Sequence, residues 1–291
     1  MDFANVAHEM FGLYREGRYQ EGAALVAQAR PHMPERDGRL TFWEACLLSR
    51  AGDPEAAIET LWAGTQRGLW WPEGMLADSD LDLARRLDRW SAVVVATEAH
   101  ERARMATRPA IRTRPSLDGG TVVALHGGHA EPDEFADRWE AGVPDEWGVA
   151  TPVGTGPLPE GGWSWGHDPA SQTEDVIRQL SAMEMVPPVI VIGFSAGAIL
   201  GIGLVSSGLE AACLVLMSPY LPHEQDIASD LGSFNGPVVL VYGSEDPESE
   251  RYDTLSGIVA ETVVIPKLGH ALPQDLKGVF DMGLRAVGRV G

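Results

Sequence analysis

The feature that most constrains the fold is a serine flanked by glycines where a short apolar run meets a longer one. The β-branched run at 189–192 predicts a buried strand, and Gly193-Phe-Ser-Ala-Gly197 follows it directly. An apolar stretch of small residues over 198–206 then predicts a helix. Glycines on both sides of Ser195 let the two backbones pass closely. The pattern therefore predicts a very tight strand-to-helix turn with Ser195 at its apex.

The same alternation of strand and helix continues over about 109–291. Further β-branched runs predict strands at 121–125, 147–152, 212–217, 238–242 and 262–265. Helical patterns lie between them, at about 131–140, 170–184, 250–259 and 273–287. This order predicts an α/β fold whose mostly parallel sheet is covered by helices on both faces. Few residues precede the strand at 121–125, so we expect about seven strands or fewer.

A serine exposed at such a turn is a candidate nucleophile, and it needs a general base. Two histidines follow Ser195 in the sequence, His223 and His270. His270 lies in a loop after the last predicted strand, where the imidazole would reach the turn, so we expect it to be the base. His223 follows an earlier strand, and we expect it to line a pocket or to lie on the surface.

The base in turn needs an acid that orients it. Asp246 ends the predicted strand that precedes His270, and we expect it to fill this role. Glu245 and Glu248 are the neighbouring alternatives. The sequence thus predicts a Ser195–His270–Asp246 triad.

A nucleophile of this kind also needs donors for a developing oxyanion. The backbone N–H of Ala196 follows the nucleophile, and His126-Gly-Gly-His129 follows the strand at 121–125. Gly128 is the expected second donor because its amide approaches a substrate without a Cβ in the way. Two histidines three positions apart with no carboxylate pattern do not indicate a metal site, so His126 is expected to bond to backbone near the turn.

Taken together, these motifs in this order resemble the α/β-hydrolase family over about residues 110–291, and most of all its phospholipase/carboxylesterase and dienelactone-hydrolase branch. Gly161-Gly-Trp-Ser-Trp165 is similar to the loop that flanks the pocket in that branch. The resemblance implies a serine hydrolase that cleaves a small carboxylic ester through an acyl-enzyme and uses no cofactor or metal. A thioesterase, a peptidase and a non-catalytic binding protein on the same scaffold are the alternatives. Aromatic residues that either line the pocket or fill the core are Trp163, Trp165, Phe194 and Tyr220.

Residues 1–108 carry helical patterns and are expected to form a separate domain before the catalytic domain at 109–291. Gly17 and Gly52 lie 35 positions apart and interrupt two similar helical pairs, close to the period of about 34 seen in tetratricopeptide repeats, which the region resembles. Two repeats bury little surface on their own. The tryptophans expected to be exposed and to need a partner surface are Trp62, Trp70, Trp71 and Trp90. We expect these helices to dock on the hydrolase, to mediate self-association, or to form an independent protein-binding arm.

The charge of the chain restricts its partners. A formal net charge of −20 at pH 7 disfavours binding to nucleic acid or to an anionic membrane. The sequence begins without a basic, apolar leader pattern, and it has no run of eighteen apolar residues. Cys46 and Cys213 lie far apart in apolar contexts and are expected to be buried thiols. These observations favour a cytoplasmic protein.

Overall fold

The computed structural model describes residues 3–166, 168–221, 227–232, 234–255 and 257–288. The chain divides into two compact units. The helical unit comprises Met1–Thr107 together with Pro157–Gly161, and the sheet unit comprises Arg108–Gly156 and Gly162–Gly291. In the described part of the chain, no helix combines the length and the apolar character needed to span a membrane.

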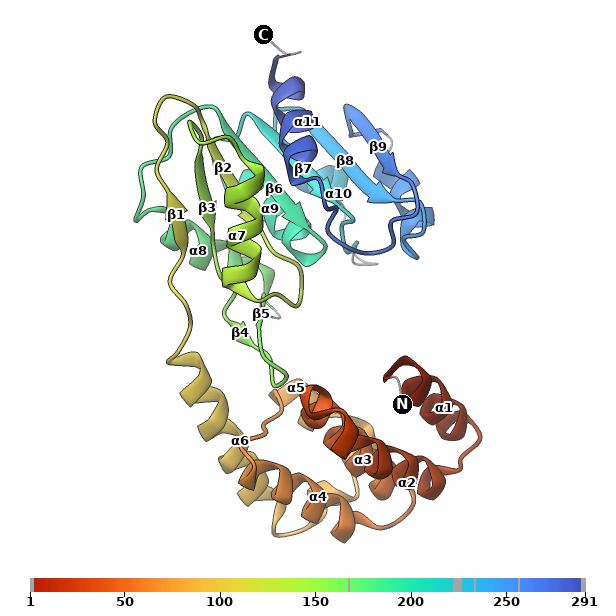
Figure 1. Cartoon of the computed structure of the whole chain (residues 1–291). Helices are drawn as coiled ribbons and strands as arrows, with labels where there is room; N and C mark the ends of the chain where they lie inside the picture. The colour runs from red at the N-terminus through yellow and green to blue at the C-terminus, as the bar shows by residue number, and fades with distance from the viewer. Residues whose placement is uncertain (1–2, 167, 222–226, 233, 256, 289–291) are drawn as a thin grey trace. The chain divides into compact units, whose positions relative to one another are not determined.

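A seven-stranded sheet forms the centre of the sheet unit (Figure 1). Its strands are β1 (Arg112–Arg114), β2 (Thr121–Leu125), β3 (Gly148–Thr151), β6 (Val189–Phe194), β7 (Cys213–Met217), β8 (Val238–Gly243) and β9 (Glu261–Ile265). They lie in the order β1-β3-β2-β6-β7-β8-β9. Only β1 runs antiparallel to its neighbour, while the other pairs are parallel. The predicted fold class is therefore confirmed, with β1 as an edge strand that was not predicted.

Helices cover both faces of this sheet (Figure 1). They are α7 (Pro132–Gly142) and α11 (Leu276–Gly288) on one face and α8 (Pro169–Leu180) and α9 (Ala196–Ser206) on the other. Successive residues of each strand point to opposite faces. Val123 and Leu125 accordingly pack into the core beneath α8 and α9, whereas Val122 and Ala124 pack beneath α7 and α11. Burial on both sides explains why β2 is a continuous apolar run.

Shorter elements complete the sheet unit. A two-stranded hairpin is formed by β4 (Gly156–Pro157) and β5 (Trp163–Ser164), and a single helical turn, α10 (Ile227–Asp230), precedes β8. The helix predicted at 250–259 is instead a 3-10 helix, η5 (Ser249–Leu255). Tyr252 and Leu255 are its buried residues, and their spacing of three matches the 3-10 period.

The helical unit begins with four helices that pack in succession. Its elements are α1 (Phe3–Arg15), α2 (Tyr19–Ala29), η1 (Arg30–His32), η2 (Pro34–Arg36), α3 (Asp37–Arg50), α4 (Pro54–Gln66), α5 (Glu73–Leu76), η3 (Ser79–Leu81), η4 (Ala84–Arg86) and α6 (Trp90–Met105). Gly17 and Gly52 follow α1 and α3 with φ values of 73° and 86°, which favour glycine. The assignment of these helices to a repeat family stays a prediction.

Pro157–Gly161 also packs within the helical unit. The Glu160 side chain is 7% exposed, and its two carboxylate oxygens accept hydrogen bonds from Arg36 Nη1 at 3.2 Å and Arg39 Nε at 2.9 Å. A carboxylate held by two guanidinium groups has both oxygens satisfied despite its burial. The segment Pro157–Gly161 is therefore anchored within the helical unit by Arg36 of η2 and Arg39 of α3.

The four tryptophans that were expected to be exposed in the helical unit are not exposed. Trp71 is fully buried, Trp70 is 5% exposed, and Trp62 and Trp90 pack against the same hydrophobic core as Trp71. Trp71 Nε1 donates a hydrogen bond to the Gly38 carbonyl at 2.9 Å, which satisfies its polar atom. The expectation was wrong because the segment after α4 buries Trp70 and Trp71 within the unit, while Trp62 of α4 and Trp90 of α6 turn toward the same core.

We predict that Gly64→Ala destabilises the helical unit by about 1–3 kcal/mol. A Cβ at Gly64 would lie 2.6 Å from Cη2 of the buried Trp71 and 3.2 Å from Cγ2 of Thr41. Gly12→Ala in α1 is the control, because nothing lies within 4 Å of that Cβ and alanine favours the helix by roughly 0.5–1 kcal/mol. Urea unfolding of both variants measures the difference. Equal effects of the two substitutions would show that Trp71 moves freely.

Candidate active site

Ser195 occupies a strained turn between β6 and α9. Its φ and ψ angles are 54° and −117°, and its N–H donates to the Met217 carbonyl at 2.9 Å. A Cβ on Gly193 would lie 2.3 Å from the Gly197 carbonyl oxygen, and one on Gly197 would lie 2.3 Å from the His126 carbonyl oxygen. Only glycine fits at either place. The two glycines thus permit a turn that holds a serine in a backbone conformation few residues adopt.

Three of the predicted site residues lie within hydrogen-bond distance of one another. His270 Nε2 is 2.9 Å from Ser195 Oγ, and His270 Nδ1 is 3.1 Å from Asp246 Oδ2. Ser195 begins the turn after β6, Asp246 follows β8 and His270 follows β9, so all three side chains lie at the carboxyl ends of parallel strands. With the carboxylate at Nδ1, the imidazole carries its proton there and presents the lone pair of Nε2 to the serine.

The Asp246 carboxylate is buried but well supplied with hydrogen-bond donors. Its side chain is fully buried, and it accepts hydrogen bonds from Ser218, from the Glu248 N–H at 3.0 Å and from Tyr252 Oη at 3.2 Å. Burial alone would raise the pKa of Asp246, but the Ser218, Glu248 and Tyr252 donors and the nearby His270 lower it, and the net shift is downward. Asp246 is therefore ionised throughout the neutral range.

Sequence patterns did not predict Ser218 or Tyr252. Ser218 directly follows β7, is 2% exposed and has a φ of 40°. Burial and the neighbouring Asp246 charge raise the pKa of Tyr252, which keeps its hydroxyl protonated as a donor. A serine or tyrosine carries no spacing signal of its own, so only the fold reveals their contact with Asp246.

The alternative acids have other surroundings. The Glu248 carboxylate pairs with Arg251 Nη1 at 2.7 Å, and only its backbone N–H contacts Asp246. Glu245 is exposed, and its N–H donates to the Leu268 carbonyl at 2.9 Å. His223 lies outside the described residues. Among the three acidic residues of this loop, the described hydrogen bonds join only Asp246 to His270.

The two expected oxyanion donors lie side by side. A Cβ on Gly128 would come 3.9 Å from the Ala196 Cβ, and one on Gly127 would come 3.5 Å from the Ser195 Cβ. Ala196 is the first residue of α9, where N–H groups have no partner within the helix and the helix dipole favours negative charge. The 127–128 backbone and the start of α9 therefore border the space in front of Ser195 Oγ.

The buried His126 side chain fixes this loop through hydrogen bonds to the backbone. It is fully buried, its Nδ1 lies 2.7 Å from the Gly127 carbonyl oxygen, and its Nε2 accepts a hydrogen bond from the Gly154 N–H at 3.0 Å. Burial lowers the pKa of His126 to about 4 and outweighs the hydrogen bond to Gly127, which raises it, while the nearby Arg108 charge adds a smaller lowering. Both ring nitrogens bond to backbone, and the ring is neutral at physiological pH.

The aromatic residues of the predicted pocket separate into two groups. Trp165 stacks on His126 with ring centroids 4.1 Å apart, and its Nε1 donates to the His126 carbonyl at 2.7 Å. Trp165 and Tyr220 line a cavity of about 200 Å³ beside Ala196. Trp163 does not reach it, because this residue is 1% exposed and its backbone pairs with Ala130. Phe194 also lies outside the lining and packs 5.4 Å from the His270 ring.

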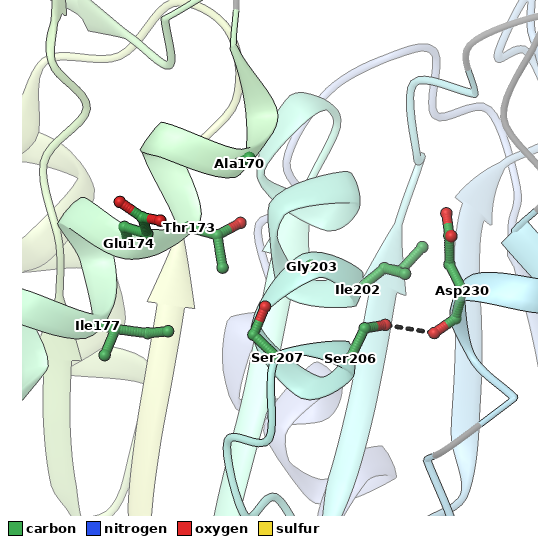
Figure 2. Close-up of a pocket in the computed structure, with 9 residues that line it drawn as sticks. All are labelled: Ala170, Thr173, Glu174, Ile177, Ile202, Gly203, Ser206, Ser207 and Asp230. Atoms are coloured by element: carbon green, nitrogen blue, oxygen red, sulfur yellow. Dashed lines mark hydrogen bonds between the residues drawn. The ribbon is translucent and has the colours of Figure 1, made fainter.

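A second and larger hollow of about 490 Å³ lies between α8 and α9. Figure 2 shows Thr173, Glu174 and Ile177 on α8 opposite the α9 residues Ile202 and Gly203. The hydroxyl of Ser206, another lining residue, is hydrogen-bonded to the Asp230 carbonyl oxygen. None of its lining residues belongs to the Ser195–His270–Asp246 cluster or to the 200 Å³ cavity. The smaller cavity is therefore the candidate substrate site.

The burial of neutral His126 predicts a loss of stability in acid. Its pKa is about 4 when folded and close to the ordinary 6.5 when unfolded, so the unfolded chain takes up the proton first as the pH falls. Above pH 6.5 the neutral His126 contributes fully to the free energy of unfolding, and this contribution is lost as the pH falls from about 6.5 to 4. At pH 5 the free energy of unfolding is lower by about 2 kcal/mol. Urea unfolding at pH 7.5 and 5 should show this loss, and His126→Asn should reduce it. Equal losses in both proteins would contradict this account of His126.

Comparisons with known proteins agree with the fold. No family model and no curated protein sequence matches the chain. An uncharacterized protein from Bacillus cereus ATCC 10987 is similar in structure, with a TM-score of 0.52, 19% identity, and coverage of 99% of this chain and 100% of that one. Esterase PE8 and Zea mays acyl-protein thioesterase 2 each have a TM-score of 0.48 and 16% identity, and cover 62% and 61% of this chain and 100% and 99% of their own. At 19% identity, the likeness to the Bacillus cereus protein shows a shared fold and nothing of the reaction.

Proposed function

We propose that this protein is a serine hydrolase that cleaves a small carboxylic ester through an acyl-enzyme intermediate. The observation that carries the proposal is the hydrogen-bond chain from Ser195 Oγ to His270 Nε2 at 2.9 Å and from His270 Nδ1 to the buried Asp246 at 3.1 Å. These two hydrogen bonds have the geometry that lets the His270 imidazole take the proton of the serine hydroxyl during attack. No cofactor enters the proposed reaction.

Each residue has a defined part in the two half-reactions. Ser195 Oγ attacks the ester carbonyl while His270 Nε2 takes its proton, and the Asp246 carboxylate stabilises the imidazolium. The N–H groups of Gly128 and Ala196 stabilise the negative oxygen of the tetrahedral intermediate. His270 then protonates the leaving alcohol, and in the second half-reaction it activates the water that releases the acid.

The conformation of Ser195 favours an enzyme over a non-catalytic scaffold. A serine at φ 54° costs roughly 1–3 kcal/mol of backbone strain, and such strain persists where the surrounding structure needs it. A binding scaffold gains nothing from a strained serine that points at a histidine. Thioesters and peptides react through the same groups, so substrates matched in their acyl group distinguish the leaving groups.

A panel of p-nitrophenyl esters of increasing acyl length, with a matched thioester and anilide, tests the proposal. We expect ester hydrolysis above the rate of the buffer, with kcat/KM highest for the shorter acyl groups because the cavity is about 200 Å³. A preference for the thioester would change the substrate class and keep the mechanism. Absence of turnover on all three substrate types would contradict the proposal.

For the helical unit we propose a protein partner or self-association, in line with the sequence expectation. Phe11 and Val95 are 49% and 65% exposed and offer apolar side chains to such a partner. We also propose that the enzyme works in the cytoplasm, which the free, buried thiols of Cys46 and Cys213 support.

A further inference from the structure

The cavity beside Ser195 has apolar walls that are held in place. Ile199 and Leu200 of α9 form one side, and Tyr220, whose N–H donates to the Ser195 carbonyl at 3.2 Å, borders it. The Trp165 ring forms another side and is fixed by its stacking on His126 and its hydrogen bond to the His126 carbonyl. The shape of the cavity is therefore largely preformed, which favours selection among ligands by size.

The volume limits what the cavity holds. Its volume is about 200 Å³. A dry cavity of roughly 150 Å³ accommodates benzene, so this one takes roughly six to eight non-hydrogen atoms. That is the size of a short acyl chain and much smaller than a fatty acyl chain.

One polar side chain interrupts the apolar lining. Gln172 on α8 is 6% exposed, and its Oε1 accepts a hydrogen bond from Thr155 Oγ1 at 2.9 Å. Its Nε2 lies toward Gly166, another lining residue, at 2.7 Å from where a Cβ on that glycine would stand. Within the described ranges, no residue accepts a hydrogen bond from this amide nitrogen. An N–H that faces the cavity without a protein acceptor is free to donate to a ligand or to water there, and a ligand that covers it without supplying an acceptor leaves it unsatisfied.

We propose that this cavity binds the acyl group of the substrate and that Gln172 recognises a hydrogen-bond acceptor on it, such as a keto or ether oxygen. The proposal rests on the proposed function, because it concerns the same serine. Ala196 both lines the cavity and begins the oxyanion site, so a carbonyl bound there places its acyl chain at the cavity. The acyl group is also the part of the substrate that stays on Ser195 through both half-reactions.

The substrate class that follows is an ester of a short acid that carries one uncharged acceptor oxygen along its chain. A purely alkyl acyl group leaves the Gln172 amide unpaired, and a site with an unpaired buried donor rejects the analogue that lacks the acceptor. A carboxylate on the acyl chain would enter walls with few polar groups and would lose its hydration. Gln172 is thus a specificity-determining residue and takes no part in proton transfer.

The test compares esters that differ in one atom or group. p-Nitrophenyl 4-oxopentanoate is paired with its 4-methylpentanoate, and the methoxyacetate is paired with the butanoate, so that an oxygen replaces a methyl or a methylene. The ratio of kcat/KM within each pair is measured for the full-length protein, for Gln172→Met and for Gln172→Glu. Because the intrinsic reactivity of each ester is the same for all proteins, only the change in ratio reports on Gln172.

We expect the ratio to fall about tenfold in Gln172→Met for at least one pair, the effect of one hydrogen bond. Gln172→Glu keeps the oxygen that accepts from Thr155 and replaces the donor by an acceptor, so it should lower the ratio at least as much. Gln28→Met, at an exposed position of α2, should leave both ratios unchanged. Unchanged ratios in both Gln172 variants would overturn the assignment of Gln172 alone. A wild-type protein that hydrolyses none of the four esters would overturn the proposed function and this inference with it.

Discussion

Ser195→Ala is expected to lower kcat for ester hydrolysis by roughly 10⁵–10⁶-fold and to leave the fold intact. The loss is large because no other group at the turn after β6 can form the acyl-enzyme, and the histidine base has nothing to deprotonate without the hydroxyl. The backbone at Ser195 is held by the N–H bond to Met217 and by the two neighbouring glycines, which the substitution does not touch. Steady-state kinetics and thermal unfolding measure the two effects.

Ser181→Ala is the matched control for this substitution. Ser181 is an exposed serine after α8 whose hydroxyl donates to the Arg178 carbonyl at 2.8 Å, and it does not line the cavity beside Ser195. The kcat of Ser181→Ala for ester hydrolysis should equal that of the wild type. If Ser195→Ala keeps more than a few per cent of the activity, Ser195 is not the nucleophile.

The second large effect is expected at Asp246. Asp246→Asn should lower kcat by about 10⁴-fold, because a neutral amide favours the histidine tautomer with its proton on Nε2, facing the serine. The Asn side chain has nearly the same shape, so the fold should change little. The loss of kcat would result from removing the negative charge of the Asp246 carboxylate, whose Oδ2 lies 3.1 Å from His270 Nδ1.

Glu248→Gln separates this charge from the general acidity of the loop. The Glu248 carboxylate pairs with Arg251, and its backbone N–H rather than its side chain contacts Asp246. The substitution should change kcat less than about threefold, as expected for a partly exposed ion pair worth under about 1 kcal/mol. A large loss in Glu248→Gln together with a small one in Asp246→Asn would move the acid to Glu248.

The strands and their helices could be predicted because burial on two faces produces long apolar runs. β2, β6, β7 and β8 each read as such a run, and the tight turn after β6 requires glycines that are visible in the sequence. The chain order serine, acid, histidine at the ends of successive strands then indicated three side chains that the structure brings within hydrogen-bond distance. These signals are local, and they need no knowledge of the packing.

Other features depend on contacts between distant segments, which the sequence does not reveal. β1 is an edge strand of three residues with two arginines, so it lacks an apolar run. The burial of Trp71 results from its packing beneath α3, where its indole bonds to Gly38. Tyr252 contacts Asp246 because a 3-10 helix, rather than the expected α-helix, presents it inward. In each case tertiary packing decided an outcome that local pattern left undetermined.

The central claim is that Ser195 is an activated nucleophile, and covalent labelling tests it most directly. Full-length protein is treated with a fluorophosphonate, its mass is measured intact, and the modified peptide is sequenced. The account predicts one adduct per chain, carried by Ser195, with no adduct in Ser195→Ala and slower labelling in Asp246→Asn. A wild-type protein that stays unlabelled, or that carries its adduct on another residue, would contradict it.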